Sequence, residues 1–142
     1  LAAGSASIGI TAAEAVLVFG TLKVNRLGVP VTILLGGVKM MLPNMVRYPM
    51  MLIPITFTAA ISGIVASFIG IGGTKESAGF GIIGLVGPIN AFRFLETDLI
   101  LVKLAIIIVA FFVVPFIVAY IAHFICMKVL KLYDKEIFRF LG

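Results

Sequence analysis

Residues 99 to 126 read LILVKLAIIIVAFFVVPFIVAYIAHFIC and form the most apolar run of the chain. The run's only formally charged residue is Lys103, near one end, where a long side chain can reach the membrane surface. A transmembrane helix needs about 20 predominantly apolar residues, because each adds about 1.5 Å across a hydrocarbon core of about 30 Å. The stretch therefore predicts a membrane-spanning helix, and Pro115 within it predicts a kink.

The composition of the whole chain indicates an integral membrane protein. Of its 142 residues, 62% are hydrophobic and 12% are charged, and the mean hydropathy is +1.27. Soluble domains carry about 25% charged residues. The net charge of +5 comes from basic residues at the ends of apolar segments, which indicates membrane flanks and not nucleic-acid binding. A single cysteine, Cys126, excludes an intrachain disulfide.

Three more segments have clear signatures. Residues 4 to 22 and 48 to 71 are long and apolar enough to span, and the first is rich in small residues that suit close helix packing. Residues 29 to 42 are too short to span and predict an interfacial or half-membrane helix. Residues 127 to 142 combine apolar and basic groups, and we expect them to form an amphipathic helical tail on the cytoplasmic leaflet.

The stretch from 77 to 94, SAGFGIIGLVGPINAFRF, is too rich in glycine for a comfortable spanning helix and too apolar for a solvated loop. If this stretch enters and leaves on one side of the membrane, eight of the 11 Lys and Arg residues lie on one face of the membrane and three on the other. If it crosses the membrane, five lie on one face and six on the other. The positive-inside rule favours the first arrangement, a re-entrant hairpin whose glycines permit the turn. A glycine-rich packing helix or a simple loop between spans is the alternative.

The predicted fold is an all-α polytopic membrane protein with about three transmembrane helices, one interfacial half-helix and one re-entrant hairpin. We expect residues 1–142 to form a single membrane domain, with residues 127–142 as its cytoplasmic tail. The chain opens LAAGSASIG without a Met, so we expect it to be part of a longer protein. Because three spans cannot enclose a pathway alone, we also expect a missing half or a second copy, most simply in a homodimer.

Residues 84 to 92, GLVGPINAF, resemble a family motif. The membrane-embedded C components (EIIC) of bacterial sugar phosphotransferase systems carry Gly-Ile-Thr-Glu-Pro-Ile-Glu-Phe at a hairpin tip, and Gly84, Pro88 and Ile89 stand in matching places. The longer stretch from 75 to 91 is similar to a divergent branch identified as enzyme IIC-like or as perfringolysin-type toxin regulators. Where the family has two carboxylates, this chain has Gly87 and Asn90.

The resemblance implies the substrate-binding and translocation portion of a sugar-type permease in the bacterial plasma membrane. Its substrate would be phosphorylated by a cytoplasmic EIIB-type phosphocarrier, and its C-terminus would be cytoplasmic. Two alternatives stay open: a membrane-bound regulator that senses a ligand without transporting it, and a secondary transporter of a small anion or amino acid. Uptake with phosphorylation, binding without uptake, and dependence on an ion gradient would distinguish the three.

Six residues are candidate substrate ligands. Glu14 lies near the middle of an apolar span, where a carboxylate is costly and usually functional. The hairpin tip, predicted at Leu85 to Pro88, would lie at a similar depth, with free backbone N–H groups and the Asn90 amide, which can both donate and accept. The full set is Glu14, Gly84, Gly87, Asn90, Lys75 and Glu76. The simpler interpretations are an interfacial Glu14 and a solvated Lys75–Glu76 pair.

No catalytic, metal-binding or cofactor motif stands out in the sequence. His123 lies three residues before Cys126, but a zinc site needs three or four protein ligands. We therefore expect no cofactor, no metal and no catalytic residue supplied by this chain, and we interpret His123 as an interfacial side chain.

Overall fold

The computed structural model describes residues 1–141, which fold into helices and turns without strands among them. The α-helices are α1 Ala2–Thr21, α2 Gly28–Leu34, α3 Leu42–Arg47, α4 Leu52–Ile69, α5 Val86–Phe94, α6 Ile100–Ile108 and α7 Val114–Phe124. Short 3₁₀ segments are η1 Gly37–Met41, η2 Pro49–Met51, η3 Ser77–Gly79, η4 Ile83–Leu85 and η7 Lys135–Phe138. Two π-helical segments are η5 Val109–Val113 and η6 Ile125–Val129. The all-α prediction is confirmed.

Three helical stretches are long and apolar enough to cross a membrane: Ala2–Thr21, Pro49–Ile69 and Ile100–Val129. They match the three predicted spans. The last combines α6, η5, α7 and η6 into one rod with a π-bulge directly before Pro115. Proline has no N–H to donate to the preceding turn, and a π-bulge is one way in which a helix absorbs that lost bond.

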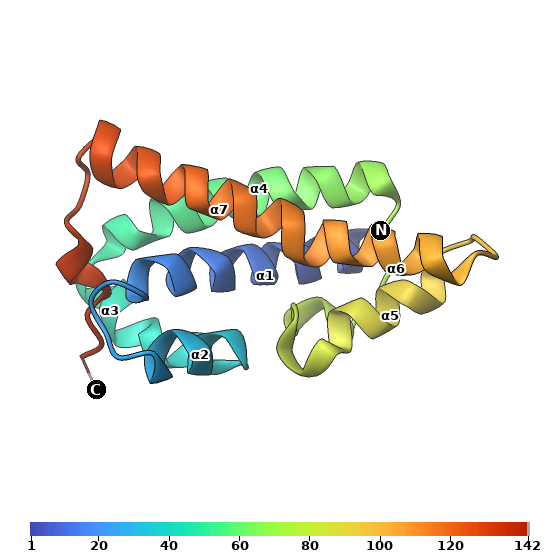
Figure 1. Ribbon diagram of the computed structural model, residues 1–142, viewed down its shortest axis with the longest axis horizontal. Helices are drawn as coiled ribbons and strands as arrows, with labels where there is room; N and C mark the ends of the chain where they lie inside the picture. Colours follow the sequence, from blue (N-terminus) through green and yellow to red (C-terminus); the bar gives the residue numbers. More distant parts are fainter. Residues whose placement is uncertain (142) are drawn as a thin grey trace.

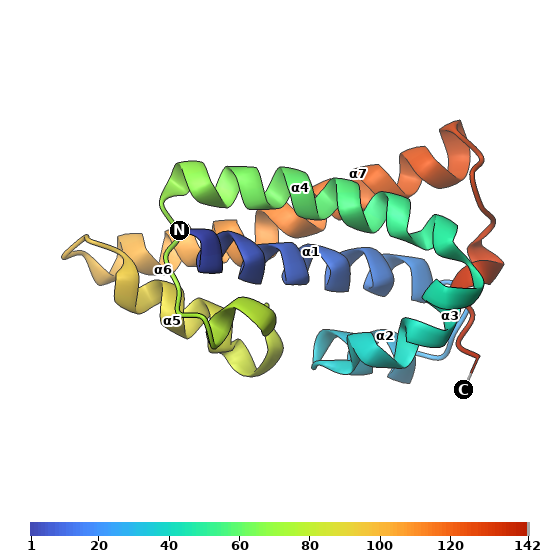
Figure 2. The same ribbon diagram turned by 180° about the vertical axis from the view of Figure 1, so that it is seen from behind.

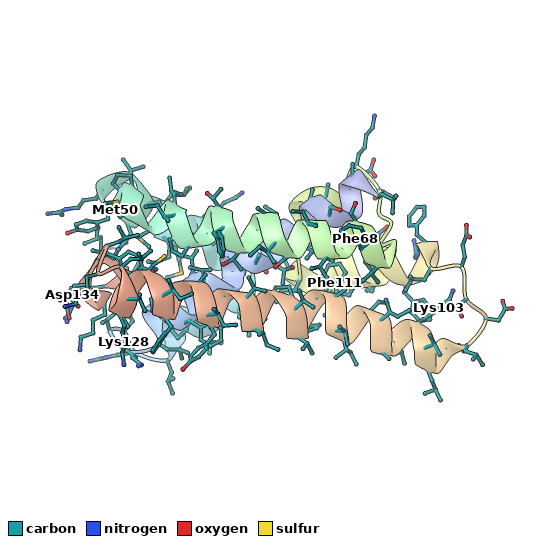
Figure 3. All side chains as sticks on the ribbon, turned by 90° about the horizontal axis from the view of Figure 1, so that it is seen from above. Met50, Phe68, Lys103, Phe111, Lys128 and Asp134 are labelled. Carbon is teal, nitrogen blue, oxygen red and sulfur yellow. The ribbon has the colours of Figure 1, made fainter. Side chains whose placement is uncertain are left out.

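The spans α4 and α7 both pack along α1 and also contact each other, so the three form a bundle with α1 beneath the other two in the view of Figures 1 and 2. Small residues permit the close approach: a Cβ added to Gly9 would lie 3.8 Å from Cβ of Ala59 on α4. Near the middle, Ala15 and Val16 pack against Ala119 of α7. In Figure 3, one end of the bundle is marked by Met50, Lys128 and Asp134 and the other by Phe68 and Lys103. Phe111 lies between the helices, inside the bundle.

The segment that follows α1 is shorter than predicted. Helix α2 ends at Leu34, the chain turns at Gly36 with φ +123°, and it returns through η1 to α3. A continuous helix over residues 29 to 42 is therefore wrong, because the glycine pair at positions 36 and 37 interrupts it.

The segment from 77 to 94 leaves the end of α4 and returns to the start of α6, so both of its ends lie at the same end of the three spans (Figure 1). We call residues 77–94 the second hairpin and residues 28–41 the first hairpin. The two lie along the same side of α1 with their turns facing each other (Figures 1 and 2). The second hairpin turns at residues 81–85, where Gly81, Gly84 and Leu85 have φ near +60°. The turn thus precedes the predicted tip at Leu85–Pro88, and Pro88 lies inside α5.

The C-terminal tail also differs from prediction. The long helix ends at Val129, and the chain then folds back over the ends of α1 and α3. The Asn44 amide donates to the backbone carbonyls of Ile137 (2.8 Å) and Arg139 (2.7 Å). The Asn25 side chain donates to the Phe138 carbonyl and accepts from the Phe140 N–H, each at 2.8 Å. The expected tail helix over residues 128–142 is wrong for the described part, and Gly142 lies outside the described residues.

Candidate functional site

A polar stripe runs along the face of α1 that supports the second hairpin. Ser7, Thr11 and Glu14 follow one another at helical spacing, and all three are buried. A Cβ added to Gly81 would lie 3.0 Å from the backbone nitrogen of Thr11, and one added to Gly87 would collide with Oγ of Ser7. The hairpin backbone therefore rests directly on this stripe.

Glu14 is the central polar group of the stripe. Its side chain is fully buried, and neither carboxylate oxygen has a hydrogen-bond partner among residues 1–141. The backbone N–H of Ile82, in the turn of the second hairpin, points toward this carboxylate without reaching hydrogen-bond geometry. An unpaired acidic side chain at this depth is costly, and in membrane proteins such groups usually face a partner, a substrate or an ion.

The turn opposite Glu14 offers unpaired donors. Within the described chain, the backbone N–H groups of Gly81 and Ile82 donate no hydrogen bond, although both residues are buried. Their neighbours are paired: Ile83 N–H donates to Phe80 (2.9 Å) and Gly87 N–H donates to the Gly81 carbonyl (3.2 Å). Buried backbone N–H groups are rarely left without an acceptor. One unpaired donor, the Ile82 N–H, therefore faces an unpaired carboxylate, and the other belongs to the residue directly before it.

The other predicted site residues lie in different surroundings. Gly84 is exposed on the outside of the turn, and Gly87 is buried against Ser7 and Phe111. The Asn90 amide donates to the Val86 carbonyl of its own helix at 3.0 Å. The structure therefore brings Glu14 to the turn of the hairpin and leaves the Asn90 amide nitrogen engaged elsewhere.

Lys75 and Glu76 are exposed where the chain leads into the second hairpin. The backbone N–H of Glu76 and the Thr74 hydroxyl lower the pKa of the Glu76 carboxyl below its ordinary value. Both side chains lie in the exposed stretch before η3, and neither reaches Glu14 or the turn.

Sequence reasoning did not identify Ser7, Thr11 and the Gly81–Ile82 peptide groups as part of the site. The spacing of Ser7, Thr11 and Glu14 on one helical face is a signal that could have found the first two. The peptide groups carried no such signal, because glycine spacing alone does not show which residues of a hairpin will occupy the turn.

The two hairpin turns touch beside the site. A Cβ added to Gly36 would lie 3.0 Å from Cγ2 of Ile83. A hollow of about 230 Å³ lies between the turns, and its lining is Leu34, Leu35, Ile82, Gly84, Leu85 and Phe112. This lining is apolar and does not include Glu14, and Ile82 is the lining residue whose N–H points toward the Glu14 carboxylate.

No group of three or more His, Cys, Asp or Glu side chains is arranged for a metal ion within residues 1–141. His123 lies near the far end of α7, where its Nδ1 is 3.1 Å from the Tyr133 hydroxyl, and it takes no part in the site. The arrangement at Glu14 can bind and orient a polar molecule.

Comparison with known proteins gives one match. A family model described as "Phosphotransferase system, EIIC" matches residues 1–140. Neither the curated proteins nor the solved structures gave a match.

Proposed function

The chain belongs to the phosphotransferase system EIIC family, and from this premise we propose that it binds a sugar between Glu14 and the Gly81–Ile82 turn. The family consists of membrane-embedded permease components that work with phosphocarrier partners. The three apolar helices agree with a multi-pass membrane protein. Our proposal adds the class of substrate and the place where it binds.

The unpaired carboxylate beside two unpaired N–H groups carries the proposal. A sugar hydroxyl can donate one hydrogen bond and accept two. A hydroxyl at this place could donate to Glu14 while accepting from Gly81 or Ile82, which would satisfy groups that otherwise lack partners. A carboxylate ligand would fit less well, because it would place a second negative charge beside Glu14.

The chain's part in phosphorylation would be to hold the sugar. A hydroxyl of the bound sugar would attack the phosphoryl group carried by a cytoplasmic EIIB-type protein, and the carrier residue would leave. The end marked by Lys128 in Figure 3 would face the cytoplasm, since Lys23, Arg26 and the basic residues of the tail also gather there. On this proposal the protein lies in the bacterial plasma membrane as a homodimer with a cytoplasmic C-terminus.

Binding of a panel of radiolabelled hexoses and disaccharides to the purified full-length protein tests the proposal. For any sugar that binds, Glu14→Gln keeps the shape but loses the charge-assisted share of the hydrogen bond, so we expect about 5- to 30-fold weaker affinity. Asn90→Ala should change affinity less, because that amide already donates to Val86. No binding of any sugar, or equal affinity in wild type and Glu14→Gln, would contradict the proposal.

A further inference from the structure

A second pocket lies between the ends of α1 and the long helix, remote from Glu14. It has a volume of about 340 Å³, and its walls come from the end of α1 and from α7–η6. Its charged and polar lining consists of Lys23, Lys128, Tyr120 and His123, and its apolar lining includes Phe19 and Phe124. Two cations therefore flank a cavity with aromatic walls.

The pocket's polar groups suit an anion. Lys128 Nζ lies 5.2 Å from the centre of the Phe124 ring, at the rim of the pocket. His123 Nδ1 is paired with the Tyr133 hydroxyl at 3.1 Å, so Nε2 is the ring nitrogen left for a ligand. No carboxylate lines this pocket in the described chain. Lysine and imidazole N–H donors around one space are the groups that bind a phosphate.

The surroundings of the pocket favour a lipid phosphate over a dissolved one. The pocket takes in the last turns of the span Ile100–Val129 and the end of the span Ala2–Thr21 with the two residues after it, where a membrane interface is expected. Apolar residues at its rim are exposed: Leu22 is 42% exposed and Phe124 is 41% exposed. Below it, Phe19 packs edge-on against Tyr120 (5.6 Å between ring centres) and Phe116 (5.9 Å). These rings form an apolar wall along which an acyl chain can lie.

We propose that this pocket binds the headgroup of an anionic phospholipid, with Lys23 and Lys128 holding the phosphate and the aromatic wall holding the first part of an acyl chain. Basic pockets between transmembrane helices on the cytoplasmic side bind anionic headgroups through the same chemistry. The proposal is independent of the sugar site, since it shares no residue with it.

Residues 1–142 contain no tryptophan, so a tryptophan substituted into them can report on lipid contact once any tryptophan elsewhere in the full-length protein is replaced by phenylalanine. Tyr120→Trp places the reporter in the pocket, and Phe57→Trp places a control on α4, where the side chain is 55% exposed. Each full-length protein is reconstituted in phosphatidylcholine nanodiscs that contain increasing fractions of a dibrominated lipid, and tryptophan quenching is measured. Dibrominated phosphatidylglycerol should quench the reporter at position 120 at lower mole fractions than dibrominated phosphatidylcholine, whereas the reporter at position 57 should not distinguish them.

Charge variants then locate the effect. The double variant Lys23→Gln/Lys128→Gln should weaken the preference for phosphatidylglycerol about thirty-fold, which corresponds to about fivefold for each lysine near an anionic surface. The control variant Lys131→Gln/Lys135→Gln removes two positive charges from the same end of the molecule, but outside this pocket. It should change the preference for phosphatidylglycerol by no more than about twofold, because exposed charges are screened by salt. Lys23→Arg/Lys128→Arg keeps the charge and should keep the preference, and a thermal melt of each variant checks folding.

Three results would overturn the proposal. Equal quenching by the two lipids at position 120 would show that no anionic site exists there. Equal losses in the two glutamine double variants would assign the preference to general surface charge. Reversal of quenching by millimolar inorganic phosphate, but not by chloride of equal ionic strength, would show that the pocket takes a dissolved anion in place of a lipid.

Discussion

Adding one methyl group at Gly87 tests whether the second hairpin is seated on α1 as the structure shows. A Cβ there would overlap the Gly81 carbonyl oxygen and Ser7 Oγ, and it would lie 2.7 Å from Cε1 of Phe111. Two of these neighbours belong to rigid elements, the backbone of the turn and a ring that is fully buried. The hairpin can accept alanine only by moving away from α1.

The expected cost follows from these contacts. Overpacking a well-packed site costs about 1–3 kcal/mol. The displacement would also weaken the hydrogen bond from Gly87 N–H to the Gly81 carbonyl (3.2 Å), which contributes about 1 kcal/mol. Alanine's better helix propensity offsets about 1 kcal/mol, because Gly87 lies in the first turn of α5. We therefore expect Gly87→Ala to destabilise the protein by about 1–3 kcal/mol.

Reversible unfolding in mixed micelles, followed by circular dichroism, measures this difference. The matched control is Gly79→Ala in the same hairpin, where an added Cβ meets no atom within 4 Å. Its effect should stay within about 0.5 kcal/mol, as for other substitutions without steric conflict. If the two variants have the same stability, the hairpin does not rest on Ser7 and Phe111, and the site at Glu14 loses its geometric basis.

Three other predictions concern the tail and the topology. Asn44→Ala removes two hydrogen bonds to the tail and should weaken its docking by about 1–3 kcal/mol, so that trypsin cleaves the tail faster. An unchanged rate of cleavage would contradict this prediction. Burial, and secondarily the neighbouring Cys126, raises the pKa of the Tyr133 hydroxyl in the folded protein. Above about pH 10 the unfolded chain therefore ionises this tyrosine more readily than the folded one, so the free energy of unfolding should fall. The fall should be smaller in Tyr133→Phe, which has no hydroxyl to ionise. Glu76→Cys and Asp98→Cys, each made in a Cys126→Ser background, should both react with an impermeant thiol reagent added outside the cell. The reason is that both sites are exposed at one end of the molecule. Labelling of the two cysteines from opposite sides of the membrane would exclude a re-entrant second hairpin.

The spans were predictable because the bilayer acts on each segment separately. Length and hydropathy of residues 99 to 126 suffice to predict a helix, whatever packs against it. Glu14 was visible for the same reason, since a carboxylate in an apolar run stands out without any knowledge of its neighbours.

The turn and the tail were not predictable in the same way. Residues 77 to 94 contain several glycines, and contacts with α1 determine that Gly81 and Gly84 take positive φ. The tail has the composition of an amphipathic helix, but Asn25 and Asn44, which lie far away in the sequence, bind its backbone where it forms only the short 3₁₀ helix η7. In both places, tertiary hydrogen bonds and close backbone contacts determine the conformation and override the local secondary-structure propensity.

These same contacts show which hairpin could move. The second hairpin is held by close packing: added Cβ atoms on Gly81 and Gly87 would meet Thr11 and Ser7 of α1, and one on Gly72, before the hairpin, would lie 2.6 Å from Cβ of Phe94. In the first hairpin, helix α2 buries Pro30 and Ile33, and a Cβ added to Gly28 at its start would meet no atom within 4 Å. Because Gly36 of the first hairpin lies against Ile83, next to the residue that faces Glu14, we expect access to Glu14 to depend on displacement of the first hairpin. The second hairpin would then act as a fixed wall of the site, and Gly36 against Ile83 would be the contact that breaks first.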